Sequence, residues 1–536
     1  METQKFVLGI DLGTSNSVAY FSTGKTSGKV VVNNNHIIPS CIYIKENGDI
    51  VCGSQARIVA DKPDQMVITN FKRIIGKKYD EIEDSHLKLH CGVSIIKDRD
   101  GKPVFHCEKG NIKRDITPIE AASFIIEDIV KGAKEMAKQM LGKVMVTVPA
   151  NFESIQRAAV REAVYNVVRK EGLEKSDIEV MNEPTAAGVC YGMDNVSGRI
   201  RNVLVYDFGA GTFDATLMRV SRGNIDVILA DGDSELGGAD CDRLIAMDFI
   251  EKHNRLNNDD LLQDCDDDDK PGVLRSIESV ARETKEKLSG DNEDDDVDIN
   301  YITGLQGTDD DDDDDDDDRS FHYTREEMNK TIKPIIERTL VVLDRLLTNA
   351  KMTVDDIDTV IPVGGSSHLT LVDDKLKEKF GNKIRKDINP NICVAKGACE
   401  YLWNKYTRSS YSFSIQEKCC FSLGVTLKND LVAWMIPVGS VLPISYTKKD
   451  LTTTEDNQSE ISCRVIQGKS YEQRTVPKNE MEDVILNHIT FSGFRIAPKG
   501  EPTFHMTYRY ETSGIIHITV VEIETGKTLY DDAIGF

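Results

Sequence analysis

Positive charge is scarce in this chain relative to negative charge. Its 536 residues include 66 Lys and Arg against 90 Asp and Glu, which gives a formal net charge of −24. Proteins that bind nucleic acids or anionic membranes generally use basic patches, so this balance argues against both classes. The sequence also lacks a charged-then-apolar signal segment and any apolar run long enough to cross a bilayer. We therefore expect a cytoplasmic protein with no nucleic-acid and no membrane partner.

Paired cysteine motifs are also missing. The chain has 12 cysteines but no C-x-x-C pair, and its one close pair is Cys419 and Cys420. A structural zinc site usually needs two such pairs, or histidines nearby. Without a secretory signal, the thiols are expected to be reduced and buried rather than joined in disulfides.

The length and the change of pattern along the chain predict two domains. A chain of 536 residues is too long for one ordinary core. Helix and strand patterns alternate up to about Tyr406, and short strands separated by turn residues follow, as in an all-β sandwich. These strands are expected at Leu423–Leu427, Leu431–Ile436, Ile461–Ile466, Phe504–Tyr510 and Ile515–Ile523. The predicted division is an α/β domain at 1–406, a linker at 407–418 and a sandwich at 419–536.

Two local signals refine the α/β domain. Thr117 followed by Pro118 and by Glu120 is typical of a helix start, and it predicts a helix over Thr117–Leu141. Asp309–Asp318 is an unbroken run of aspartate. Ten like charges in a row repel one another and cannot be buried, so the run is predicted to be a disordered, solvated insertion.

Two short stretches resemble one another. Val203–Asp214 (VLVYDFGAGTFD) and the N-terminal FVLGIDLGTSNS, which starts at Phe6, each have an apolar strand, an aspartate, then glycine and hydroxyl residues. Glycine permits positive φ and lets backbone amides approach an anion, while the aspartate can hold a hydrated divalent cation. A single copy would be equally typical of an ordinary glycine-containing hairpin that binds no nucleotide. Two copies predict two related halves that face one nucleotide.

As a pair, these stretches resemble the phosphate hairpins of the actin-like ATPase fold. Further strings select within that fold: NFKRIIG (70–76), VPANFESIQR (148–157), NEPTAA (182–187) and VGGS (363–366). In order and spacing they resemble the heat shock protein 70 (DnaK-type) chaperone family over almost the whole chain. The resemblance implies an α/β actin-like (ribonuclease H-like) two-lobed ATPase domain followed by an all-β peptide-binding sandwich. No helical lid follows the sandwich in the sequence, so a divergent member is expected.

The resemblance also implies a set of site residues and the cofactors ATP/ADP and Mg²⁺. Asp11 and Asp207 would hold the metal through water. Catalysis would rest on Lys72, Glu183, Asp207 and Thr212. The other nucleotide contacts would come from Gly13, Thr14, Ser15, Asn16, Gly209, Ala210, Gly211, Arg282, Lys285, Glu286, Ser289, Gly364, Gly365, Ser366, Ser367 and His368. Pro149 and Arg157 match positions that the family uses to transmit the nucleotide state.

Several residues depart from the family pattern. Arg282 and Glu286 carry the opposite charges to those expected, and His368 and Asn391 replace an arginine and an aspartate. These changes put adenine affinity and turnover in doubt. Ala210 replaces a glycine, which costs little if its φ is negative and more if it is positive.

The function implied is that of an ATP-dependent chaperone for unfolded or extended polypeptides, with J-domain co-chaperones and nucleotide-exchange factors as expected partners. In the linker, Ser412–Gln416 offers only Phe413 and Ile415 where the family has four aliphatics, so weak coupling between peptide and ATP is expected. One alternative is a non-cycling relative that binds ATP and acts as a partner or exchange factor. Another is a small-molecule kinase on the same fold.

Overall fold

The structure of the chain is a computed structural model. It describes residues 5–60, 62–82, 90–194, 199–221, 223–257, 260–263, 266, 269–289, 295–299, 321–385, 387–407, 414–426, 431–468, 475–477 and 483–534. The Asp309–Asp318 run and Phe413 lie outside these described residues, so both expectations stay predictions.

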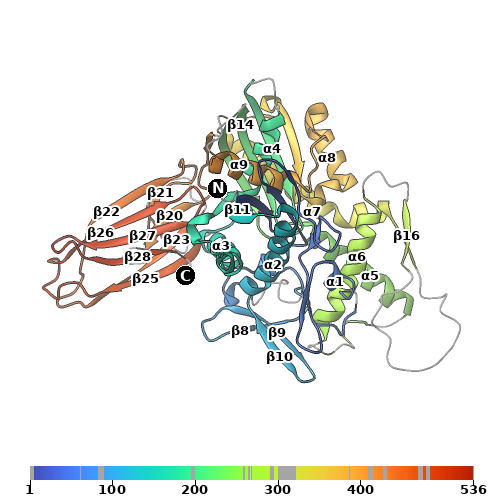
Figure 1. Cartoon of the computed structure of the whole chain (residues 1–536), viewed down its shortest axis with the longest axis horizontal. Coiled ribbons are helices and arrows are strands. Elements are labelled where there is room, and N and C mark those ends of the chain that lie inside the picture. Colours follow the sequence, from blue (N-terminus) through green and yellow to red (C-terminus); the bar gives the residue numbers. More distant parts are fainter. Residues whose placement is uncertain are drawn as a thin grey trace.

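The first half of the α/β region, residues 5–182, is built on a six-stranded sheet (Figure 1). Its order is β12-β11-β1-β2-β3, and β4 pairs with β2. The strands β1 and β2 form the antiparallel hairpin predicted at the N-terminus, and β1 pairs in parallel with β11. Their bounds are β1 (Lys5–Asp11), β2 (Asn16–Ser22), β3 (Ser27–Lys29), β4 (Ile38–Pro39), β11 (Met140–Val148) and β12 (Ile178–Asn182).

The second half, residues 183–407, repeats this arrangement around a five-stranded sheet in the order β18-β13-β14-β15-β19. The hairpin β13-β14 is antiparallel, and β13 pairs in parallel with β18. Its last strand, β19, comes from beyond the α/β region and pairs in parallel with β15. The bounds are β13 (Arg201–Phe208), β14 (Phe213–Ser221), β15 (Asn224–Asp233), β18 (Thr359–Val363) and β19 (Ser414–Gln416).

Smaller sheets extend the two halves at their outer edges. The order β6-β5-β7 and the order β10-β9-β8 belong to the first half, and β16 pairs with β17 in the second. Their bounds are β5 (Ile42–Ile44), β6 (Ile50–Cys52), β7 (Val67–Ile68), β8 (Ser94–Lys97), β9 (Pro103–Lys109), β10 (Ile112–Ile116), β16 (Asp296–Ile299) and β17 (Phe321–Thr324).

Helices α2, α3, α4, α7 and α9 pack on the strands of the two sheets. The α-helices of the described residues are α1 (Ser54–Arg57), α2 (Pro118–Ala137), α3 (Ser154–Val168), α4 (Glu183–Asp194), α5 (Gly238–Asn257), α6 (Lys270–Lys287), α7 (Arg325–Ala350), α8 (Thr370–Phe380) and α9 (Cys393–Thr407). The start of α2 agrees with prediction, because Thr117 and Glu120 form a capping box. Its predicted end at Leu141 was wrong. Lys138 adopts a left-handed conformation that stops the helix, and β11 begins at Met140.

Hydrophobic clusters correspond to this layout. One cluster lies within the first half and a second within the second half. A third cluster joins them, because it contains Val7 and Met145 from the first sheet together with side chains of β13, β14, α4 and α9. The helices and strands between the two halves are therefore held in place by a shared hydrophobic core.

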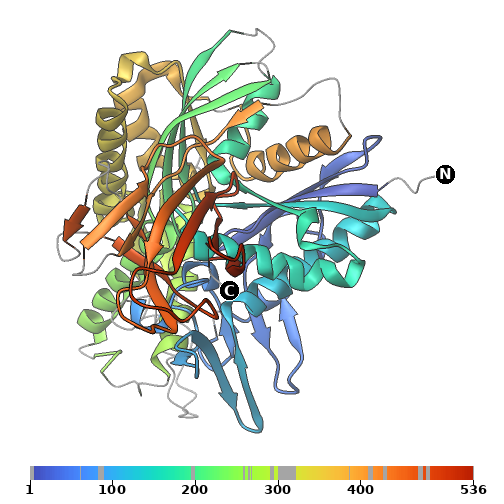
Figure 2. The ribbon, with the colours of Figure 1, turned by 90° about the vertical axis from the view of Figure 1, so that its left-hand side faces the viewer.

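Beyond α9 two antiparallel sheets extend to one side of the α/β region, in orange and red (Figures 1 and 2). Their orders are β24-β21-β20-β23-β25 and β22-β26-β27-β28, and side chains of both share one core. The bounds are β20 (Ser422–Thr426), β21 (Leu431–Ile436), β22 (Ile444–Thr452), β23 (Glu460–Gly468), β24 (Thr475–Pro477), β25 (Asp483–Ser492), β26 (Thr503–Tyr510), β27 (Ile516–Glu522) and β28 (Thr528–Ala533). Two sheets around one core are the predicted all-β sandwich.

The sandwich contacts the first half through hydrogen bonds at the start of α3. The Ser154 hydroxyl accepts from the Ile516 amide at 2.9 Å, and the Ser154 amide donates to Gln467 Oε1 at 3.2 Å. Arg157 donates to the Ser513 carbonyl at 3.1 Å.

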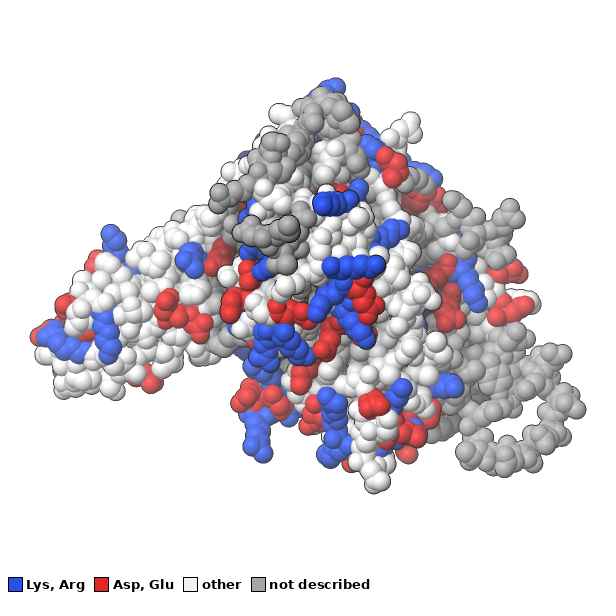
Figure 3. All heavy atoms as spheres, viewed as in Figure 1, with Lys and Arg blue, Asp and Glu red and all other residues white. Residues whose placement is uncertain are grey.

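In the parts of the chain that the structure describes, no helix is both long and apolar enough to span a membrane. On the face in Figure 3, basic and acidic side chains are interspersed.

Candidate functional site

The two glycine hairpins line a single cavity of about 680 Å³ between the halves. All of the predicted site residues except Ser367 lie in its wall. The Ser367 hydroxyl instead donates to the Gly364 carbonyl at 2.7 Å, so it supports the loop after β18. The hairpin turns line this cavity together with side chains of α1 and α6.

Gly13 and Gly211 of the hairpins are needed because neighbouring atoms leave no room for a side chain. Gly13, Gly209 and Gly211 are not among the residues with positive φ, so that part of the sequence prediction was wrong. A Cβ on Gly13 would lie 1.9 Å from the Asn16 carbonyl oxygen, and one on Gly211 would lie 2.3 Å from Thr14 Oγ1. The two turns thus lie against each other. Ala210 also has no positive φ, so the methyl group that replaces glycine's hydrogen causes no backbone strain there.

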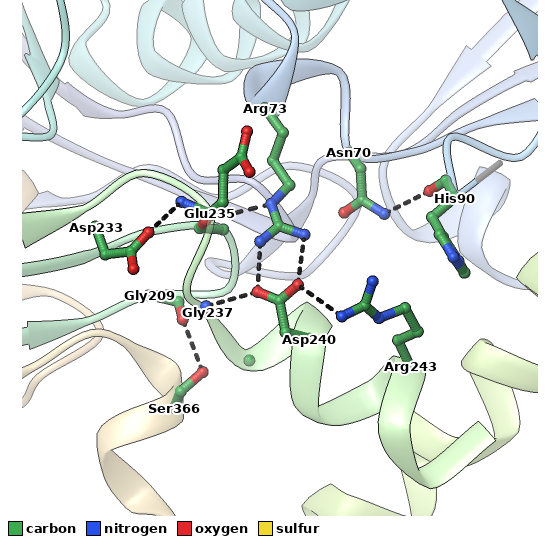
Figure 4. Close-up of polar contacts among 12 residues, drawn as sticks. Asn70, Arg73, His90, Gly209, Asp233, Glu235, Gly237, Asp240, Arg243 and Ser366 are labelled. Atoms are coloured by element: carbon green, nitrogen blue, oxygen red, sulfur yellow. Dashed lines mark hydrogen bonds and ion pairs between the residues drawn. The ribbon is translucent and has the colours of Figure 1, made fainter. Parts of the chain in front are cut away.

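The second turn is joined to the start of α5 and to the first half. The Gly209 carbonyl accepts from Ser366 Oγ and from the Gly238 amide, each at 2.9 Å. Arg73 donates to the Gly211 carbonyl at 3.2 Å and pairs with Asp240 (Figure 4). That ion pair is bidentate, at 3.2 Å and 2.5 Å, and both side chains are buried. The stretch that carries Lys72 therefore lies directly against the second turn.

Buried carboxylates gather beside the two turns. Burial, and then the charge of Glu183, raise the pKa of Asp11 to about 7. Burial, then Glu183 and Asp214, raise the pKa of Asp207 well above its usual range. Asp214 lies directly opposite Asp207 across the β13-β14 hairpin, and burial raises its pKa to about 8. Such a group of carboxylates fits a cation, because a cation removes the cost of ionising them together.

Lys72 supplies a positive charge that lowers the pKa of each of these acids. Its Nζ lies 2.8 Å from Glu183 Oε1, and both side chains are almost fully buried. The Lys72 ammonium also lies 5.6 Å from the centre of the Phe152 ring. Among the residues that the structure describes, no group of three or more His, Cys, Asp or Glu is placed to hold a metal directly.

Replacing Asp214 should change the pH dependence of stability. Its pKa is about 8 in the fold and about 3.9 in an unfolded chain. The folded state therefore binds the proton more tightly, and this group makes stability fall as pH rises from about 4 to 8, by about 1.4 kcal/mol per pH unit. Asp214→Asn should remove that one-proton slope. Urea unfolding without nucleotide between pH 5 and 8 would measure it. Asp100→Asn, at an exposed site, is the control, and an unchanged slope in Asp214→Asn would contradict the prediction.

Asp242, also in the cavity wall, pairs with two cations of α6. Lys285 Nζ lies 2.6 Å from Asp242 Oδ1, and Arg282 Nε lies 3.3 Å from Oδ2. Glu286, the other residue of this helix whose charge departs from the family pattern, is exposed and also lines the cavity.

Sequence reasoning missed Asp214, Asp242 and Arg57. Asp214 stands at the end of the quoted hairpin stretch, and the register of a short hairpin would have placed it opposite Asp207. Asp242 follows Asp240 by two residues near the start of α5, but no local sequence pattern indicates that it pairs with side chains of α6. Arg57 lines the cavity and donates to the Ser15 carbonyl at 3.0 Å, a contact that depends on tertiary structure alone.

Paired glycine turns that meet at a cavity with buried carboxylates and lysine side chains define a class: proteins that bind phosphate groups together with a cation. Comparison with known proteins is consistent with this class. A family model described as Hsp70 protein matches residues 7–530. The chaperone protein DnaK of Thermosipho africanus is 28% identical over 530 residues, which are 98% of this chain and 79% of that protein. The chaperone protein dnaK of Cyanidioschyzon merolae is 29% identical over 97% of this chain and 80% of its own. The chain belongs to the Hsp70 family.

Proposed function

We propose that this protein is an ATP-dependent molecular chaperone. In this proposal residues 1–406 form a two-lobed, actin-like ATPase domain, 407–418 link it to the sandwich, and 419–536 bind unfolded or extended polypeptides. The observation that carries the proposal is the single cavity between the halves, which both glycine turns and the buried Lys72–Glu183 pair line. Its volume suits a nucleotide.

The residues at the phosphate end would divide the work of hydrolysis. Backbone amides around Gly13–Asn16 and Gly209–Thr212 would cradle the phosphates. Lys72 would stabilise the charge that develops on the phosphoryl oxygens, while Glu183 and Thr212 would orient water. Bound Mg²⁺ would neutralise phosphate charge, with Asp11 and Asp207 on its water shell.

Polar contacts offer a path from this end to the sandwich. Asn182, which precedes Glu183, accepts from Arg157 at 2.7 Å and donates to Glu417 of the linker at 3.1 Å. The Glu417 carboxylate is buried, and burial raises its pKa. Arg157 also contacts the sandwich at Ser513. In β19 only Ile415 is partly buried, so this strand offers little apolar contact. We therefore propose that these polar groups couple nucleotide binding to peptide binding.

Partners and location follow from the same proposal. The chain would bind unfolded polypeptides and would work with J-domain co-chaperones and nucleotide-exchange factors. Eleven cysteines within the described residues are free thiols, which agrees with a reducing compartment such as the cytoplasm.

Single-turnover hydrolysis on purified protein would test this function. Protein in excess over labelled ATP, with Mg²⁺, should convert it to ADP, and an unfolded peptide should change the rate by less than about threefold if the linker couples weakly. Phosphate transfer to a small molecule in place of hydrolysis would contradict the proposal. So would the lack of any binding of unfolded peptide.

A non-cycling relative that binds ATP and assists other chaperones is the second candidate. The observation that favours it is the altered cavity wall, in which Glu286 and His368 stand at positions where the family resemblance implies basic side chains. Tight nucleotide binding without single-turnover hydrolysis would select this candidate.

A further inference from the structure

Two arginines from different halves of the protein line the same cavity. Arg57 belongs to α1 of the first half and Arg282 to α6 of the second, and both side chains lie in the cavity wall. Like charges repel one another, and they do so more strongly where solvent is excluded. Two guanidinium groups in one cavity are therefore suited to a negative group bound between them.

The two guanidinium groups lie close enough to affect each other. Burial, and then the charge of Arg282, lower the pKa of Arg57 to about 10. The Cys41 thiol responds to both of them: burial raises its pKa, while the charges of Arg57 and then Arg282 lower it. The two arginines therefore share one neighbourhood inside the protein.

Arg57 forms no ion pair with a carboxylate within the described part of the chain. Its guanidinium donates to the Ser15 carbonyl at 3.0 Å, while its buried Nε meets no oxygen acceptor there. Glu286 and Asp242 act on it as charges beyond ion-pair distance. Buried donors without acceptors cost free energy, so Arg57 is suited to a ligand oxygen. Because Ser15 belongs to the first glycine turn, that ligand would lie beside the turn.

Arg282 is only partly neutralised by its surroundings. Asp242 shares its carboxylate between Arg282 Nε at 3.3 Å and Lys285 Nζ at 2.6 Å, and Glu286 is exposed. In the cavity wall, α1, α5 and α6 together contribute three cations, Arg57, Arg282 and Lys285, against the two carboxylates. This excess of positive charge favours an anion.

A phosphate group is the anion that fits this arrangement. A guanidinium group can donate two parallel hydrogen bonds to phosphate oxygens. The two turns and Lys72 suit the 5′-phosphates of a nucleotide, which leaves its ribose and base for the rest of the wall, where α1 and α6 contribute. In dinucleotide-binding sites an acidic side chain holds the ribose hydroxyls, whereas an arginine accommodates a phosphate on the ribose.

We propose that Arg57 and Arg282 form an anion subsite for a phosphate group on the ribose of the bound nucleotide, so that the preferred ligand carries one phosphate more than ADP or ATP. This inference rests on the proposed nucleotide binding. A free phosphate ion bound beside the nucleotide has the same chemistry, and the test separates the two sources.

Isothermal titration calorimetry with Mg²⁺ is the test. The ligands are ADP, ADP with an additional 2′- or 3′-phosphate, and ADP in the presence of millimolar inorganic phosphate. In the wild type, a ribose phosphate should tighten binding about tenfold or more relative to ADP, since it accepts charge-assisted hydrogen bonds. A gain in affinity with inorganic phosphate alone would assign the subsite to the free ion.

Arg57→Met and Arg282→Met should each bring the affinities for ADP and for its phosphorylated derivative within about threefold of each other, because each change removes one guanidinium group. The ratio is measured within each variant, so a general loss of nucleotide affinity does not alter it. Arg338→Met is the matched control: the same change at an exposed side chain of α7 that pairs with Asp233. It should keep the wild-type ratio.

Two results would overturn the inference. The first is a wild-type chain that binds ADP and its phosphorylated derivatives equally and does not respond to inorganic phosphate. The second is a gain in affinity that persists in a folded Arg57→Met or Arg282→Met variant. Since the two arginines stand in different halves, one variant that folds is enough for this comparison. A wild-type chain that binds none of these nucleotides would overturn the proposed function as well.

Discussion

Lys72→Ala is expected to lower single-turnover ATP hydrolysis by about a hundredfold or more, and to leave nucleotide affinity within about tenfold. The phosphate cradle consists of backbone groups in the two turns, which this change does not touch. Lys72 is the cation placed among Asp11, Asp207 and Glu183, so its removal affects the charge that develops during transfer more than the charge of the bound ground state. Filter binding and quenched-flow hydrolysis would measure the two quantities, and an equal loss of both would contradict this role.

Removing Lys72 also leaves Glu183 buried without its partner. Breaking a buried ion pair commonly costs about 3 to 5 kcal/mol, so Lys72→Ala should be less stable than the wild type. The double variant Lys72→Ala with Glu183→Gln removes the unpaired charge and should regain stability without regaining hydrolysis. Lys77→Ala is the control, because Lys77 pairs with Glu235 at 2.9 Å nearer the surface and outside the cavity wall. Its hydrolysis rate should stay within about twofold of the wild type.

The sequence predicts the parts of this molecule that depend on local patterns. The hairpin after Phe6 and the one after Val203 show as apolar strands that end in aspartate and glycine, and both form as predicted. The strand Leu431–Ile436 has the predicted bounds. The cap at Thr117 was also predictable, because a capping box needs only residues three positions apart.

Features that depend on tertiary contacts were not predictable in this way. A glycine in the turn that follows Asp207 suggests positive φ, whereas Gly211 has to be small because Thr14 from the other hairpin lies against it. The pairing of Arg282 with Asp242 joins α6 to α5, and no spacing in the sequence indicates that these two helices present those side chains to each other. The residue roles inferred from the family resemblance stay predictions until the variants are measured.

The contact between sandwich and α3 yields the remaining prediction, because one glycine there lies directly against an arginine. Gly514, in the turn between β26 and β27, has φ +77°, and a Cβ on it would lie 2.7 Å from Arg157 Nε. Arg157 cannot simply move aside. Its guanidinium donates to Phe152, Ala150 and Asn182 at 2.7 to 2.8 Å, and any shift breaks those bonds.

Gly514→Ala is therefore expected to separate the sandwich from α3, and Gly500→Ala is its matched control. Gly500 has φ +84° and open space around it, so both variants bear the same left-handed strain of about 1 to 2 kcal/mol, but only the change at Gly514 meets Arg157. Amide exchange followed by mass spectrometry would report the result. The amides of Ser154 and Ile516 donate across the interface, and in Gly514→Ala they should exchange about tenfold or more faster, since each loses its acceptor to solvent. In Gly500→Ala the same amides should keep their wild-type rates. Equal protection in both variants would mean that the Arg157 contact does not determine whether the sandwich stays docked, and the linker Glu417 would then be the group to test next.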